Sequence, residues 1–404
     1  MKIGVWLVEG YVPSVGGGFS YYDKLINAID NYQFSKEIEI CFVTPSKNKI
    51  SGLNKNVYYL KNKRQRLWCR WKIYIPVIRQ LLAESYYKEE KKNRDAEWIK
   101  QLKSLNIQFI FYPIQASCQI DNFPFVINNW DIGHCSTFSF PEVVMNGEFE
   151  WRECFYKTVL PKALMIFTES HAGKKELIKY LSLKDEKIKV LPIFAGDCVN
   201  VEVTSDLQEQ ILQKYGLKDN FYFFYPAQFW AHKNHLHLLE AFAEFQKKHK
   251  TFKIVFTGSD KYNQKYIETI AEKLGVSSNV LFLGFVDMDV IKTLYTHATS
   301  LTMVSYFGPT NMPPLEALHT NCPIICSDLE GHREQLGDAA IYVNPNNSHS
   351  IYLAMEKIYA SRDLYKVKVR EQYMNTPFKV ETSIRLLNDY LHEAAEIRRT
   401  WGEV

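Results

Sequence analysis

The stretch FGPTNMPPLEALHTNCPII, residues 307–325, brings together residue types that could bind an anion. Its first prolines fix φ and lack an amide donor, so they predict a stiff loop that ends where the helix-forming LEALH begins. Gly308, Thr310 and Asn311 would then precede a helix N-terminus, whose free amides and dipole suit a phosphate. Glu316, in the first turns, could accept two hydrogen bonds from a diol such as a ribose. A proline-rich turn before a buried helix accounts for the same pattern equally well.

Two other segments place polar residues where expected strands end. In QFWAHKN, residues 228–234, Lys233 could neutralise a diphosphate at a helix start, although most lysines are simply exposed. In FVINNWDIGH, residues 125–134, Asp131 and His134 follow a strand directly, at the edge where parallel sheets bind ligands. A lone histidine is more often structural, but the neighbouring carboxylate favours a site role for His134.

The N-terminal segment predicts the opening of a βαβ unit. Residues 2–8 form an apolar run of strand length, and a glycine loop and a helical pattern over residues 19–32 follow it. Gly17 and Gly18 would let the main chain approach a ligand at the end of the first strand. Flexible turns use the same residues, and the dinucleotide fingerprint GxGxxG is absent from this loop.

Strand and helix patterns alternate along the rest of the chain, which predicts an α/β protein with parallel, doubly wound sheets. The expected strands lie at residues 38–45, 56–60, 107–114, 125–134, 163–170 and 187–193, and then at 221–227, 252–258, 279–285, 300–308, 322–328 and 339–344. A polar stretch at residues 197–219 divides the two series. It predicts one domain over residues 1–197 and a second from residue 198, followed by charged helices over 348–404.

Composition sets the broad class of the protein. The 404 residues are 46% hydrophobic and 23% charged, as in an ordinary soluble globular protein, and a net charge of +4 gives no reason to expect nucleic acid. The eight cysteines are scattered without CxxC, so we expect reduced cytosolic thiols. The N-terminus does not read as a signal peptide, and no apolar run approaches the roughly 20 residues of a spanning helix. The protein is therefore expected to be soluble or peripherally attached.

Two features have competing interpretations. Residues 61–94 mix lysine and arginine with tryptophan and tyrosine, which is typical of a helix that lies on an anionic membrane surface, but an ordinary solvated helix is slightly favoured. Asp287 and Asp289 could suggest a metal ion for a sugar nucleotide. Acidic residues are also common in the first turn of a helix, and that interpretation is favoured, so no metal site is expected.

With these motifs in hand, the chain resembles the retaining GT-B glycosyltransferases of family 4 (group 1). The resemblance rests on the glycine loop, DIGH, FTES, KVLP, AQFWAHKN, GF and FGPTNMPPLEALHTNCPII, and it covers essentially the whole chain. Family members usually carry two glutamates separated by seven residues; Glu316 matches the second, but Gly308 stands at the first. They also usually place an arginine five residues before the phosphate lysine, where this chain has Gln228.

The resemblance implies two Rossmann-like domains whose parallel, doubly wound sheets face a central cleft. Residues 1–197 would bind the acceptor and 198–378 the nucleotide sugar, with helices at about 379–404 packing back on the first domain. Catalytic roles are implied for His134, Lys233 and Glu316. Neither a cofactor nor a metal is implied, because Lys233, the main chain at 308–311 and a helix dipole would stabilise the leaving diphosphate. The implied donor-binding residues are Gly17, Gly18, Gln228, Lys233, Val286, Gly308, Pro309, Thr310, Asn311 and Glu316.

The function implied is transfer of a sugar, with retention, from a nucleoside-diphosphate sugar to a glycan or lipid-linked acceptor. We expect a role in surface polysaccharide or lipopolysaccharide synthesis, in the cytoplasm or at the inner face of the cytoplasmic membrane. A sugar-nucleotide epimerase and a non-catalytic sugar-nucleotide-binding subunit are the alternatives. The base, the sugar and the acceptor cannot be read from the sequence.

Overall fold

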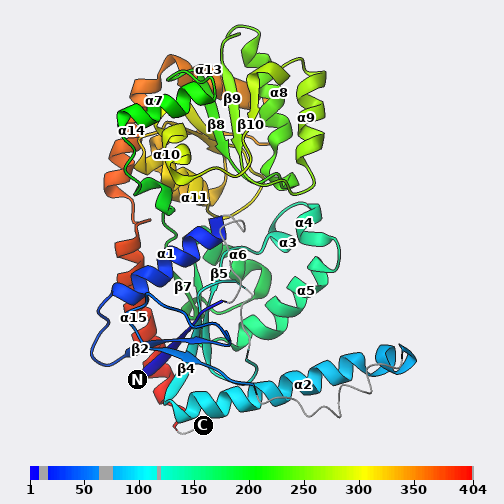
Figure 1. Ribbon diagram of the computed structural model, residues 1–404, viewed down its shortest axis with the longest axis vertical. Helices are drawn as coiled ribbons and strands as arrows, with labels where there is room; N and C mark the ends of the chain where they lie inside the picture. The colour runs from blue at the N-terminus through cyan, green and yellow to red at the C-terminus, as the bar shows by residue number, and fades with distance from the viewer. Residues whose placement is uncertain (9–16, 63–75, 116–119, 403–404) are drawn as a thin grey trace.

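A computed structural model describes residues 1–8, 17–62, 76–115 and 120–402. It has two domains, one above the other, and each is built on a parallel sheet with helices packed against it (Figure 1). The strand series predicted from the sequence is confirmed in both domains, because strands buried on both faces give continuous apolar runs.

The first sheet has seven strands in the order β3-β2-β1-β4-β5-β6-β7, all parallel. Central β1 pairs Ile3 with Ile40 on one side and with Phe109 on the other. The strands are β1 (Lys2–Trp6), β2 (Glu39–Thr44), β3 (Val57–Tyr59), β4 (Ile107–Tyr112), β5 (Phe125–Asn129), β6 (Met165–Thr168) and β7 (Ile188–Val190).

The second sheet has six parallel strands in the order β10-β9-β8-β11-β12-β13. In both sheets the strand order reverses beside the first strand, which is where open α/β sheets bind ligands. The strands are β8 (Tyr222–Pro226), β9 (Lys253–Thr257), β10 (Val280–Phe282), β11 (Ser300–Met303), β12 (Ile324–Ser327) and β13 (Ala340–Val343).

The helices occupy the positions that the apolar periodicity predicts. Ser170 caps α6, since its side chain accepts a hydrogen bond from the amide of Gly173. Asp287 stands at the N-cap position of α10 but makes no side-chain capping bond. The helices are α1 (Gly17–Asn31), α2 (Pro76–Ser104), α3 (Gly133–Ser136), α4 (Pro141–Val144), α5 (Glu148–Cys154), α6 (His171–Leu181), α7 (Ser205–Lys214), α8 (His235–Gln246), α9 (Gln264–Lys273), α10 (Met288–His297), α11 (Met312–His319), α12 (Glu330–Leu336), α13 (Ser348–Ala360), α14 (Arg362–Asn375) and α15 (Val380–Arg399).

The chain crosses between the domains twice. Phe194 packs in the core of the first sheet, stacked on Tyr21 at 4.9 Å, whereas Ala195 already packs in the core of the second. After α14 the chain returns, and α15 runs down the side of the first domain (Figure 1). Its Leu387 and Leu391 are fully buried in the first core.

Of the basic and aromatic segment 61–94, residues 63–75 lie outside the described residues, so membrane attachment stays a prediction. At its end, Lys91 and Arg94 form ion pairs with Asp95. Within the described part of the chain, no helix is both long enough and apolar enough to cross a membrane.

Candidate functional site

Lys233 is held at the carboxyl end of β8 by a short, rigid loop. It closes a 3₁₀ turn, Ala231–Lys233, and its carbonyl accepts a hydrogen bond of 2.8 Å from the Tyr225 hydroxyl. The next residue, Asn234, has φ of 60° and donates to the Val304 carbonyl at 3.1 Å. These bonds tie the loop to the end of β11, so the position of Lys233 is fixed before any ligand binds.

Asn311 links Lys233 to α12 through a chain of hydrogen bonds. The Lys233 ammonium donates to Asn311 Oδ1 at 3.2 Å, and Asn311 Nδ2 lies 2.9 Å from His332 Nε2. His332 Nδ1 lies 2.9 Å from the Ser327 carbonyl, so Nδ1 carries the proton and Nε2 accepts. Gln335 bonds both the amide and the carbonyl of Asn311. Asn311 is therefore part of the same site as Lys233.

Burial controls the charge of this cluster. It lowers the pKa of Lys233 to about 8, against the opposing effect of the carboxylates of Glu142 and Asp131. It also lowers the pKa of His332 to about 4. At pH 7 the lysine is therefore charged and the imidazole neutral, which leaves a half-buried cation beside Asn311.

The loop that joins this cluster to α11 is tightly packed but has a free hydroxyl. Thr310 is buried, and among the described residues its Oγ1 has no hydrogen-bond partner. Gly308 has φ of 109°, a conformation that favours glycine. A Cβ on Gly331 would lie 1.2 Å from the Pro309 carbonyl oxygen, so only glycine fits there. The sequence did not point to Gly331, because the contact joins the first turn of α12 to a loop more than 20 residues earlier in the chain.

Glu316 lies in the second turn of α11, beside the chain crossing at residues 194–196. Its Oε2 accepts a hydrogen bond of 2.8 Å from the Tyr295 hydroxyl. Burial raises its pKa, and hydrogen bonds from Tyr295 and Cys198 oppose that shift. A Cβ on Gly196 would lie 2.7 Å from Glu316 Oε1, so a larger residue there would collide with the carboxylate.

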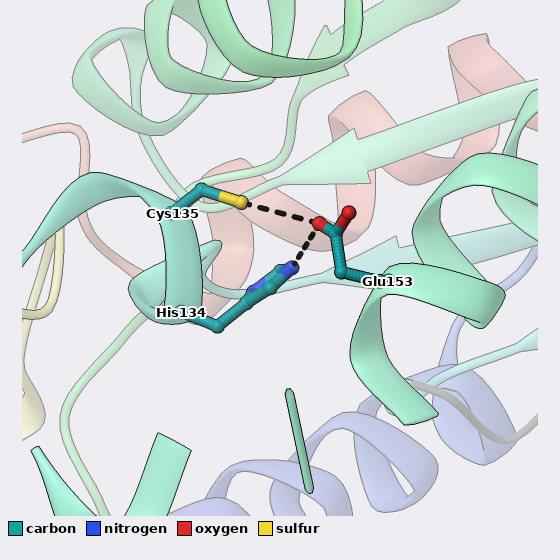
Figure 2. Close-up of side chains that lie close together, drawn as sticks. All are labelled: His134, Cys135 and Glu153. Carbon is teal, nitrogen blue, oxygen red and sulfur yellow. Dashed lines mark hydrogen bonds and ion pairs between the residues drawn. The ribbon is translucent and has the colours of Figure 1, made fainter. Parts of the chain in front are cut away.

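The expected strand over residues 125–134 ends at Asn129, so His134 lies five residues beyond β5, in α3, and its imidazole is turned into the first domain (Figure 2). The side chain is fully buried, and its ring packs against Tyr156 at 4.9 Å. Its Nε2 lies 3.2 Å from Glu153 Oε1, and the Cys135 thiol donates to the same oxygen at 3.4 Å. Burial and nearby Arg152 lower the pKa of His134. The direct role predicted for His134 in donor binding stays a prediction.

His134, Cys135 and Glu153 could in principle hold a metal ion, because their ligand atoms lie within 4.8 Å of one another (Figure 2). Lys157, however, forms an ion pair with the second oxygen of Glu153. A histidine that binds a metal usually donates its other ring proton, and His134 Nδ1 has no partner among the described residues. A hydrogen-bonded network centred on Glu153 therefore fits these side chains better than a metal site.

Gly17 and Gly18 form the start of α1. Ser20, on the same first turn, comes within 3.7 Å of the position that a Cβ on Gly196 would take. The beginning of α1 therefore approaches the chain crossing beside Glu316.

Gln228 and Val286 lie at the same edge of the second sheet as Lys233. Gln228 donates to the Ser259 hydroxyl and accepts from the Trp230 indole, each at 3.0 Å. Val286 follows β10 and packs against the core of its domain. Both were predicted to contact the donor, and these positions leave the predictions open.

With this geometry described, similarity to known proteins becomes informative. Residues 207–373 match the family Glycosyl transferases group 1. EpsD of Bacillus subtilis, named as a glycosyltransferase, is 30% identical over 39% of this chain and 41% of its own length. The O-antigen chain mannosyltransferase RfbU of Salmonella typhimurium is 28% identical over 48% and 50%. The chain thus spans half or less of these two relatives, but MJ1607 of Methanocaldococcus jannaschii aligns at 22% identity over 89% of both chains.

Solved structures agree over nearly the whole chain. Sucrose-phosphate synthase from Thermosynechococcus elongatus superposes with a TM-score of 0.71 at 17% identity, covering 98% of this chain and 99% of its own. WaaG, a glycosyltransferase involved in lipopolysaccharide biosynthesis, gives 0.66 at 15% identity, over 95% and 98%. HepE from Anabaena in complex with UDP-glucose gives 0.68 at 14% identity, over 97% and 100%. The fold is GT-B, as predicted.

Two carboxylates join the two domains in opposite directions, and the sequence indicated neither. Glu142 on α4 accepts a hydrogen bond of 2.9 Å from the main-chain amide of His232 and also contacts its Nδ1. Glu334 on α12 accepts bonds of 2.9 Å from the amides of His171 and Ala172, at the start of α6. A glutamate in a helical segment is ordinary in a sequence, so only the packing of the domains reveals these contacts.

Proposed function

We propose that the protein is a retaining glycosyltransferase that uses a nucleoside-diphosphate sugar. One observation carries the proposal. The charged, half-buried Lys233 donates to Asn311 directly before α11, within the segment that matches the group 1 family, and the buried hydroxyl of the preceding residue, Thr310, has no hydrogen-bond partner among the described residues. A cation, a free hydroxyl and a helix N-terminus are together the partners that a diphosphate needs.

These groups would stabilise the charge that develops on the leaving group. The bond between the anomeric carbon and the diphosphate oxygen breaks, while the acceptor hydroxyl oxygen forms the new bond on the same face of the sugar. The departing phosphate oxygen takes the acceptor proton. Lys233 and the dipole of α11 supply the compensating charge, so the proposed reaction needs no metal. Glu316 would bind the ribose hydroxyls in place of its present bond to Tyr295.

The relatives suggest candidates for the sugar and the pathway. RfbU is named as an O-antigen chain mannosyltransferase, and HepE was solved with UDP-glucose. We therefore propose a hexosyl donor, with mannosyl and glucosyl donors to be tried first. The acceptor would be a glycan or a lipid-linked glycan of a surface polysaccharide or lipopolysaccharide, glycosylated at the inner face of the cytoplasmic membrane.

A thermal-shift screen with UDP, GDP, dTDP and ADP tests donor binding first. A nucleotide at 100 times its dissociation constant stabilises a protein by about 2.7 kcal/mol, which gives a clear rise in Tm. The matching sugar nucleotides are then assayed for transfer, and the anomeric configuration of the product is determined by NMR. No Tm rise with any of the four nucleotides would overturn the proposal. Binding without transfer would support a non-catalytic subunit, and conversion of the donor sugar without acceptor would support an epimerase.

A further inference from the structure

Glu142 is a buried carboxylate that reaches from one domain into the other. It belongs to α4, on the face of the first domain that is turned toward the second (Figure 1). Its side chain is 8% exposed, and its Oε1 contacts both the main-chain amide and the imidazole of His232. A buried carboxylate is stable only when it is paired and hydrogen-bonded, so His232 is a required partner.

His232 in turn belongs to the loop that presents Lys233. The His232 ring packs on Phe307 at 4.1 Å, and the His232 carbonyl accepts a hydrogen bond of 2.8 Å from the amide of Tyr306. Phe140, two residues before Glu142, packs on Phe307 at 6.2 Å. His232 directly precedes Lys233, and Phe307 directly precedes Gly308. The residues around Glu142 therefore adjoin both Lys233 and the loop that begins at Gly308.

We propose that Glu142 is a positioning residue of the transfer site. From the first domain, Glu142 holds the loop that carries Lys233, and it thereby completes the donor site when the two domains meet. The inference rests on the proposed glycosyltransferase function. It adds to it a residue of the first domain that acts on donor binding through His232, without touching the donor.

The charge of Glu142 supports this role. Burial acts to raise its pKa, but the hydrogen bonds from His232 outweigh that effect and hold the pKa below its ordinary value. The carboxylate is therefore ionised at neutral pH, and its field keeps the Lys233 ammonium charged despite burial. Loss of this charge would loosen the loop and weaken the cation together.

Glu334 provides a matched comparison within the same molecule. It also joins the two domains, but it binds the main-chain amides of α6 and makes no bond to the loop at 228–234 among the described residues. A glutamate that only holds the domains together should behave like Glu334. Glu142 should behave differently, because its partner adjoins Lys233.

The test compares Glu142→Gln and Glu142→Asp with Glu334→Gln and with Glu150→Gln, an exposed residue on α5. Donor KM, kcat and Tm are measured for each, and nucleotide binding is measured with whichever of UDP, GDP, dTDP or ADP stabilises the wild type. We expect Glu142→Gln to raise donor KM about tenfold with a smaller change in kcat, because a charged hydrogen bond is lost. Glu142→Asp should recover part of the loss. Glu334→Gln should change KM less than threefold, and Glu150→Gln should match the wild type.

Three results would count against the inference or its basis. Wild-type kinetics in Glu142→Gln, in an enzyme that transfers sugar normally, would overturn the inference alone. Equal KM changes in Glu142→Gln and Glu334→Gln would reduce Glu142 to a domain contact and also overturn it. A wild-type protein that neither binds a nucleotide nor transfers a sugar would overturn the proposed function, and the inference with it. If Glu142→Gln fails to fold, Glu142→Asp decides by the same criteria.

Discussion

The two ends of the segment 308–316 have opposite electrostatic surroundings. At one end the Lys233 ammonium donates a hydrogen bond to Asn311, and the carboxylates of Glu142 and Asp131, in the first domain, favour its charged form. At the other end stands the carboxyl group of Glu316, whose pKa is raised by burial, and the charge of a lysine of the first domain partly opposes that shift. A cation therefore lies at the beginning of this short segment and a buried carboxyl group at its end.

That lysine is Lys24 on α1, and it also fixes the chain crossing. Its ammonium donates to the Ala195 carbonyl at 2.9 Å and pairs with Asp197 at 3.4 Å. The first domain thus supplies a counter-charge to each end of the segment. The difference suggests a division of labour in which Lys233 binds the diphosphate and Glu316 binds a neutral, hydroxyl-rich group. The variants described next test whether Lys233 and Glu316 bind different parts of the donor.

Lys233→Ala should have the largest effect. Removal of the cation should lower kcat/KM about 100-fold, as expected when a strong contact to a charged ligand is lost. It should also abolish inhibition by inorganic pyrophosphate, which has no ribose. Lys265→Ala, at an exposed site on α9, is the control and should retain wild-type activity. Unchanged pyrophosphate inhibition in Lys233→Ala would contradict a diphosphate site at this end.

Gly331→Ala should disturb the lysine end through packing alone. The added Cβ would overlap the Pro309 carbonyl, so the loop must move. We expect a loss of stability of about 1–3 kcal/mol, as for other overpacked sites, measured by urea unfolding. Donor KM should rise in the protein that remains folded. Wild-type stability would show that the loop is free to shift.

Glu316→Gln should affect only the other end of the segment. We expect donor KM to rise about tenfold, because a carboxyl group that can accept two hydrogen bonds from a diol is replaced by an amide with a single acceptor oxygen. Pyrophosphate inhibition should stay at the wild-type level, in contrast to Lys233→Ala. Equal loss of pyrophosphate binding in both variants would show that the two ends act as one site.

The smallest effect is a pH dependence at the lysine end. The pKa of Lys233 is about 8, and its charged form exists below that value, so donor KM should rise a few-fold as pH increases from 7 to 9. Bound diphosphate would favour the ammonium and move the change to higher pH. Lys233→Arg should remove the dependence, since arginine stays charged. A donor KM that is flat over this range in the wild type would contradict the titration of Lys233.

The titratable groups around Lys233 are not expected to produce the same profile. Burial lowers the pKa of His235 to about 3, and those of His232 and His332 to about 4, so these imidazoles are neutral throughout the range from pH 7 to 9. The remaining neighbours that act on the lysine are the carboxylates of Glu142 and Asp131.

Much of the fold could be predicted because its signals are local. Every expected strand is present, since a strand buried on both faces must be a continuous apolar run. The Ser170 cap was predictable from one residue before a helical pattern. Lys233 and Asn311 were predicted as separate candidates at the same sheet edge, and the structure brings them within 3.2 Å of each other.

The sequence by itself determined the two α/β domains and the residue types at the edges of their sheets, because apolar periodicity and strand-end loops depend on near neighbours. Only the tertiary structure decided how those residues are used. In the folded protein the His134 ring faces Glu153, and a side chain on Gly331 would collide with the Pro309 carbonyl. Glu142 of the first domain contacts His232 of the second. These outcomes depend on rotamers and on contacts between segments far apart in the chain, which no local pattern records.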